Sequence, residues 1–142
     1  MDERWISFIY HFNVKKDYFE CHELGESLWL DTGRPIVLKG MIQAAVCLYH
    51  FENGNVKGAT SMWFRARDYL TPYLPRYEGV DLERLIHDLD DYFAHIPYAL
   101  YDRQLSATDL AAIKVPVVTL TIYDEELYRI VQSYLPSEEH EE

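Results

Sequence analysis

Apolar side chains recur along most of this chain at intervals of three and four residues, the spacing of amphipathic helices. Stretches rich in Asp, Asn, Gly and Pro separate these runs and supply capping residues such as Asp2, Asp17 and Asp81. Asp17 followed by Glu20 has the form of a capping box. The expected helices cover residues 2–12, 17–30, 36–51, 56–70, 81–96, 106–113 and 124–135.

The run from Ile36 to Phe51 is almost free of charge, which predicts the central and most buried helix. Val117–Ile122 looks like a strand, but the sequence shows no partner strand for it. Because the connections are short, neighbouring helices should be antiparallel. We therefore expect an all-α, single-domain antiparallel helical bundle over residues 1–136. A short extended segment lies near its C-terminus, and residues 137–142 form an acidic, disordered tail.

Composition narrows the possible functions. Of the 142 residues 49% are hydrophobic and 26% charged, the balance of a soluble globular domain, and the net charge is −11. This charge argues against nucleic acid and anionic membranes as partners. No membrane-spanning run or secretory signal is apparent, and two cysteines in helical patterns, Cys21 and Cys47, suggest reduced thiols. We expect a cytoplasmic protein.

One stretch carries the candidate chemistry. His22, Glu26 and Trp29 stand at i, i+4 and i+7 and share one face of the second predicted helix. Gln43, Cys47 and His50 have the same spacing on the third predicted helix, with Tyr49 and Asn55 close by in sequence. If these helices pack antiparallel, the two polar faces meet. Asn55 also fits the N-cap of the next helix, and Arg34 could pair with a carboxylate or bind an anion.

A divalent metal ion is one expectation for this site. Imidazole and carboxylate ligands from His22, Glu26 and His50 suit Zn²⁺, Mn²⁺ or Fe²⁺, and helix bundles build metal sites in this way. An open coordination position would support hydrolysis. Glu20 and Glu23 are candidate bases, although they lie about 160° and 100° from His22 around the helix.

Two other interpretations remain open. The same residues could form a buried hydrogen-bond network in a non-catalytic interaction or scaffold protein, in which 117–122 joins a partner or a second copy. Alternatively, a pocket walled by Trp29 and Tyr49 could hold a small ligand. Cys47-x-x-His50 lacks the spacing of a zinc finger, so both cysteines are expected to be buried and inert.

Three blocks resemble the DUF309 family: Asp17–Trp29, Leu38–His50 and Gly54–Ala59. The resemblance spans about residues 8–70 and implies a small helical bacterial or archaeal protein of unknown function. The family motif H-x-x-x-E-x-x-[W/Y], for which metal binding has been suggested, corresponds to His22, Glu26 and Trp29. Gly25 departs from the family, which usually has an apolar helix former there, and it could allow close helix contact.

Overall fold

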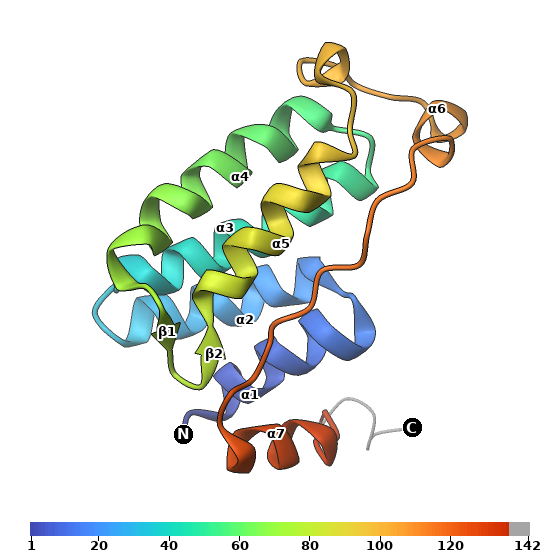
Figure 1. Cartoon of the computed structure of the whole chain (residues 1–142). Helices are drawn as coiled ribbons and strands as arrows, with labels where there is room; N and C mark the ends of the chain where they lie inside the picture. Colours follow the sequence, from blue (N-terminus) through green and yellow to red (C-terminus); the bar gives the residue numbers. More distant parts are fainter. Residues whose placement is uncertain (137–142) are drawn as a thin grey trace.

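Helices dominate the computed structural model, which describes residues 1–136, and most of them match the predicted ranges (Figure 1). A π-helical turn, His11–Lys15, continues the first helix, and two short strands form a hairpin before the fifth. The expected all-α class is confirmed. The elements are α1 (Glu3–Tyr10), α2 (Tyr18–Asp31), α3 (Ile36–Glu52), α4 (Val56–Leu70), β1 (Arg76–Tyr77), β2 (Val80–Asp81), α5 (Leu82–Ala94), α6 (Ala107–Ala111) and α7 (Glu125–Gln132).

Side-chain caps define where these helices begin. At α2 the carboxylate of Asp17 accepts a hydrogen bond from the backbone N–H of Glu20 at 3.0 Å, as the capping-box pattern predicts. Asn55 caps α4 by accepting from the N–H of Gly58 at 2.9 Å. Each cap pairs an N–H that the helix itself leaves unpaired, so the sequence signals translate directly into helix starts. The same arrangement occurs at Asp2, Asp81, Ser106 and Asp124.

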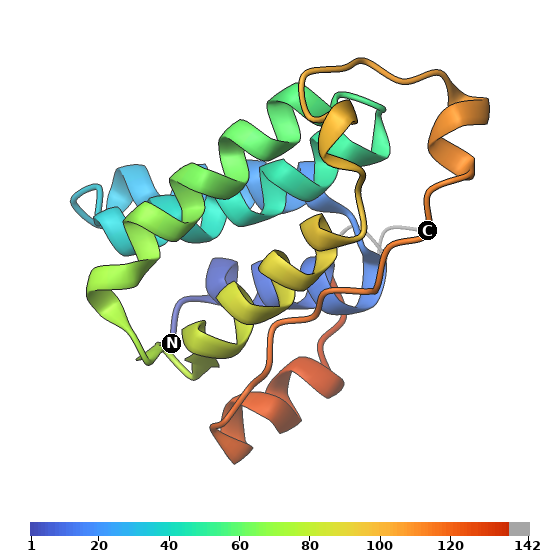
Figure 2. The same cartoon turned by 45° about the horizontal axis from the view of Figure 1, so that its top comes forward.

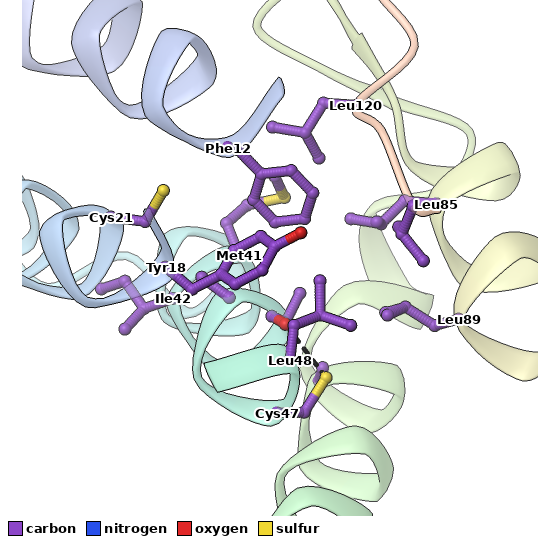
Figure 3. Packing of buried hydrophobic residues seen from close by; sticks show 14 of the residues in the cluster. Phe12, Tyr18, Cys21, Met41, Ile42, Cys47, Leu48, Leu85, Leu89 and Leu120 are labelled. Atoms are coloured by element: carbon purple, nitrogen blue, oxygen red, sulfur yellow. Dashed lines mark hydrogen bonds between the residues drawn. The ribbon is translucent and has the colours of Figure 1, made fainter. Parts of the chain in front are cut away.

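The predicted central helix, α3, lies between its neighbours and is buried along most of its length. Gly40 lets α4 come close, because a Cβ at this position would lie 2.8 Å from Leu70. Figure 3 shows Phe12, Tyr18, Met41, Leu48, Leu85 and Leu120 gathered from the first three helical segments, α5 and the C-terminal segment. One connected cluster of buried apolar side chains therefore joins both ends of the described chain.

The segment between α6 and α7 runs extended across the bundle, past α5 and α1 (Figures 1 and 2). Asn13 serves as its partner on one side: its amide donates to the carbonyl of Leu120 at 2.9 Å and accepts from the Leu120 N–H at 2.7 Å. On the other side Ile122 forms an antiparallel bridge with Val80 of β2. The strand-like pattern of 117–122 thus has a partner that the sequence did not reveal.

α7 then packs beside α1, where the rings of Tyr10 and Tyr134 are 5.3 Å apart. The acidic tail predicted for residues 137–142 lies outside the described residues. Within residues 1–136, no helix combines the length and the apolar character needed to cross a membrane.

Candidate functional site

His22, Glu26 and Trp29 share one face of α2, as their spacing predicts. The imidazole Nε2 of His22 lies 3.2 Å from a carboxylate oxygen of Glu26, and its Nδ1 lies 3.5 Å from the carboxylate of Glu23. Both ring nitrogens thus face a carboxylate. The side chains of His22 and Glu26 are 38% and 52% exposed, so solvent and solutes can reach the pair.

This pair stands at a pocket of about 280 Å³ between α2, α3 and α4, which we call the His22 pocket. Trp29 forms part of its wall on α2, and Gln43 projects from α3. Of the polar face predicted on the third helix, only Gln43 meets His22 and Glu26 at this pocket. Its lining consists of His22, Glu26, Trp29, Lys39, Ile42, Gln43, Val46 and Met62.

Two polar atoms of the lining side chains are buried and have no hydrogen-bond partner among the described residues: Nε1 of Trp29 and Oε1 of Gln43. Buried polar groups normally have partners, because an unpaired one costs about 1–3 kcal/mol. Both atoms belong to side chains in the wall of one pocket, but because they are buried, either side chain must move before its atom can pair with a bound group.

Two positively charged side chains, Lys39 and Arg34, lie close to the indole ring of Trp29. The ammonium of Lys39 lies 4.9 Å from the ring centre, and the guanidinium of Arg34 lies 5.4 Å from it. Such cation–π contacts hold both side chains against the ring. Arg34 was predicted to pair with a carboxylate or bind an anion; the structure places it over Trp29, outside the pocket lining.

Gly25 explains how α2 and α3 come close enough to share the pocket. A Cβ on Gly25 would lie 2.6 Å from Cγ1 of Ile42 in α3 and 3.2 Å from the ring of Phe8 in α1. No side chain fits at this separation without moving its neighbours. The departure from the family pattern is thus a point of close helix contact, one residue before Glu26.

The other predicted residues of the third helix lie elsewhere. His50 does not line the His22 pocket; its Nδ1 faces the amide of Asn55 at 3.3 Å, and partial burial lowers its pKa. The ring of Tyr49 lies 5.8 Å from the ring of Phe19, tilted by 45°, and Tyr49 does not line the pocket. Cys47 is fully buried. His50 lies seven residues, about two helical turns, beyond Gln43 and is therefore farther along the third helix than the pocket lining.

Across residues 1–136, no three His, Cys, Asp or Glu side chains form a group that could hold a metal ion. The structure thus does not assemble His22, Glu26 and His50 into the expected three-ligand set. The buried network offered as the alternative is also wrong for this pair, because both side chains are more than a third exposed. The structure shows an arrangement that the sequence did not predict, an accessible His22–Glu26 pair beside a partly buried pocket.

Some of the remaining candidate residues lie where the sequence predicted, and others do not. Glu20 is not part of the pocket lining, whereas Glu23 reaches His22 despite its angular offset. Both cysteines are buried and free, and burial raises the pKa of their thiols, as expected of inert groups. Lys39 was missed as a site residue. Its position four residues before Gln43, on the same face of the helix, was the available signal.

Fold and pocket together define a small helical-bundle protein with a solvent-accessible pocket between α2, α3 and α4, at which His22 and Glu26 stand. Residues 5–62 match the model of DUF309, a domain of unknown function, which confirms the resemblance inferred from the three sequence blocks. Every residue that lines the His22 pocket falls within this segment.

A segment of 58 residues is also 40% identical to the uncharacterized protein YpuF of Bacillus subtilis (strain 168). It covers 39% of this chain and 33% of that relative, so the likeness spans about a third of the relative's length. No solved structure matches the chain.

Proposed function

We propose that the His22 pocket binds a divalent metal ion, Zn²⁺, Mn²⁺ or Fe²⁺, through His22 and Glu26. The observation that carries the proposal is the 3.2 Å separation between His22 Nε2 and the Glu26 carboxylate. Two ligands at about 2.0–2.2 Å from one tetrahedral ion lie about 3.3–3.6 Å apart, so the separation of this pair is close to that of two ligands of one ion.

Two neighbours support the same proposal. Glu23 lies 3.5 Å from Nδ1 of His22, where its carboxylate would accept the Nδ1 proton once Nε2 binds a metal. We therefore propose that Glu23 positions the His22 ring, whereas the sequence suggested it as a candidate catalytic base. Gln43 Oε1, buried without a partner, is an oxygen ligand of the kind that could complete the set.

A metal ion held by so few protein groups keeps open positions, and such an ion can lower the pKa of bound water for hydrolysis. Lys39 would then lie beside the open side of the pocket, where its charge favours an anionic substrate. We accordingly propose a metal-dependent hydrolase as the enzyme class. The buried, free thiols of Cys21 and Cys47 support a cytoplasmic location.

Elemental analysis of protein purified without chelator, then incubated with each metal salt and desalted, tests the proposal. We expect about one ion per chain in the unmodified protein and at least a tenfold loss in a His22→Ala/Glu26→Ala variant. His50→Ala is the matched control, because His50 lies outside the pocket, and it should retain the metal. An unmodified protein that holds no metal would refute the proposal, and loss of metal in the control would return His50 to the ligand set.

Lys39 favours a second candidate, a non-catalytic pocket for a small anion. Its ammonium and the partnerless indole N–H of Trp29 are both donors in the lining of the pocket. Stabilisation of the metal-free protein by inorganic phosphate or a carboxylic acid, abolished by Lys39→Met, would support this function. Absence of any such shift would leave the metal site as the stronger candidate.

A further inference from the structure

A second and larger pocket, of about 450 Å³, lies where the start of α2, the end of α3, α5 and the C-terminal segment meet. We call it the tyrosine pocket. Most of its wall is apolar, and its volume lies in the range of cavities that enclose small organic ligands. It is lined by Lys16, Tyr18, Phe51, Glu52, Tyr92, Leu110, Val115, Pro116, Val117 and Val118.

Two tyrosine side chains in this wall are more than nine-tenths buried, Tyr18 at 7% exposure and Tyr92 at 5%. Neither hydroxyl has a hydrogen-bond partner among the described residues. Neither oxygen is among the buried side-chain atoms without a partner in the described residues, which are Trp29 Nε1 and Gln43 Oε1 in the wall of the His22 pocket. Both hydroxyls therefore open into the pocket, where a bound group can pair with them.

Ring contacts hold the two phenols in place. Tyr18 packs edge-on against Phe12 at 5.3 Å, and Figure 3 shows its ring between Phe12 and Leu48. Tyr92 packs edge-on against Phe51 at 5.5 Å. The hydroxyl positions are thus set before any ligand arrives, which reduces the entropy lost on binding.

Two opposite charges stand in the wall of the pocket, and neither has an ion-pair partner among the described residues. Burial lowers the pKa of Lys16, whose ammonium has only a long contact of 3.4 Å to the carbonyl of Val118. Burial and the charge of Asp17 raise the pKa of Glu52. Lys16 is half-buried, so its charged form would gain from an opposite charge brought by a ligand, and the exposed carboxylate of Glu52 can pair with a positive charge on the same ligand.

We propose that the tyrosine pocket binds a small zwitterion with an apolar body, the chemistry of a free aromatic or branched α-amino acid. Its carboxylate would pair with Lys16 and its ammonium with Glu52, while Tyr18 and Tyr92 supply hydroxyls to the polar head. The apolar side chain would lie against Phe51 and the valines of the C-terminal segment.

Titration calorimetry with three probes tests this assignment: L-phenylalanine, phenethylamine without the carboxylate, and 3-phenylpropionate without the ammonium. L-Phenylalanine should bind at least about tenfold more tightly than either analogue, because each analogue loses one charge-assisted contact. No saturable binding of L-phenylalanine up to about 10 mM would overturn the proposal, as would an analogue that binds equally well.

Single-residue variants test which side chain binds which charged group of the ligand. Glu52→Gln should weaken the binding of L-phenylalanine and phenethylamine but leave the binding of 3-phenylpropionate unchanged. Lys16→Gln should weaken the binding of L-phenylalanine and 3-phenylpropionate but leave that of phenethylamine unchanged. Glu83→Gln, an exposed site on α5, is the matched control and should change nothing. Tyr92→Phe keeps the packed ring and removes only the hydroxyl, so it should weaken L-phenylalanine several-fold without unfolding the protein. Unchanged affinity in both charge variants would overturn the assignment.

Discussion

The two pockets differ in where along the chain their walls come from. The His22 pocket is the smaller of the two, and its lining comes entirely from the segment that matches DUF309. The tyrosine pocket is larger, is mostly apolar and depends on Tyr92 and on residues 110–118, beyond that segment. The difference indicates that helix spacing alone can present a polar pair, whereas the larger apolar pocket needs part of its wall from a distant part of the chain.

Because their walls come from different parts of the chain, the two pockets are held in shape by different contacts. Close contact of α2 and α3 at Gly25 shapes the His22 pocket, and the pairing of Asn13 with Leu120 anchors the cover of the tyrosine pocket. Changes at one support should therefore leave the other pocket largely intact.

The largest effect is expected from Gly25→Leu. The added side chain would collide with Ile42 and Phe8 and should lower the free energy of unfolding by about 3 kcal/mol, measured by urea denaturation. Ser61→Leu adds the same side chain at an exposed position of α4 and should change stability by less than about 0.5 kcal/mol. Equal stability of the two variants would show that α2 and α3 do not need the glycine.

Asn13→Ala should cost about 2 kcal/mol, because it leaves the N–H and the carbonyl of Leu120 without their partner. Hydrogen exchange at the Leu120 amide should accelerate, while metal content stays the same. Asn53→Ala, which removes an exposed contact to the carbonyl of Tyr49, is the control and should have a smaller effect. Slow exchange at Leu120 in the variant would mean that the C-terminal segment is anchored by other contacts.

Lys39→Met should raise the affinity of the His22 pocket for Zn²⁺ by about two- to tenfold, because it removes a positive charge from the pocket lining. Competition with a chromogenic chelator measures this change. Lys57→Met, at an exposed position of α4, removes a charge outside the pocket and should have little effect. If both variants behave alike, Lys39 does not influence the metal.

The smallest effect concerns pH. Burial and the charge of Asp17 raise the pKa of Glu52, so folding disfavours its ionised form, and this cost develops as the pH rises above the ordinary value near 4.5. Glu52→Gln should therefore gain stability over the unmodified protein between pH 4 and pH 7, by no more than about 0.5 kcal/mol, since solvent screens this exposed carboxylate. A difference in melting temperature that shrinks toward pH 7 would contradict this sign.

Most helix positions could be predicted because their causes are local. Asp17, Asn55 and Asp81 cap the helices they were expected to cap, since a cap involves only the next three residues. The hairpin of β1 and β2 was missed, because two-residue strands leave no periodic pattern. Within the site, the face shared by His22, Glu26 and Trp29 was predictable from helix geometry, whereas the exclusion of His50 depended on how α2 and α3 pack together.

The sequence by itself determined the all-α class, the helix starts and the joint orientation of His22 and Glu26, because these follow from the period and hydrogen bonding of single helices. Only the tertiary structure decided that Gln43 and Lys39 face that pair, that Asn13 receives Leu120, and that the C-terminal segment covers Tyr18 and Tyr92. These contacts join residues up to 107 positions apart, and their formation depends on how the apolar faces pack together.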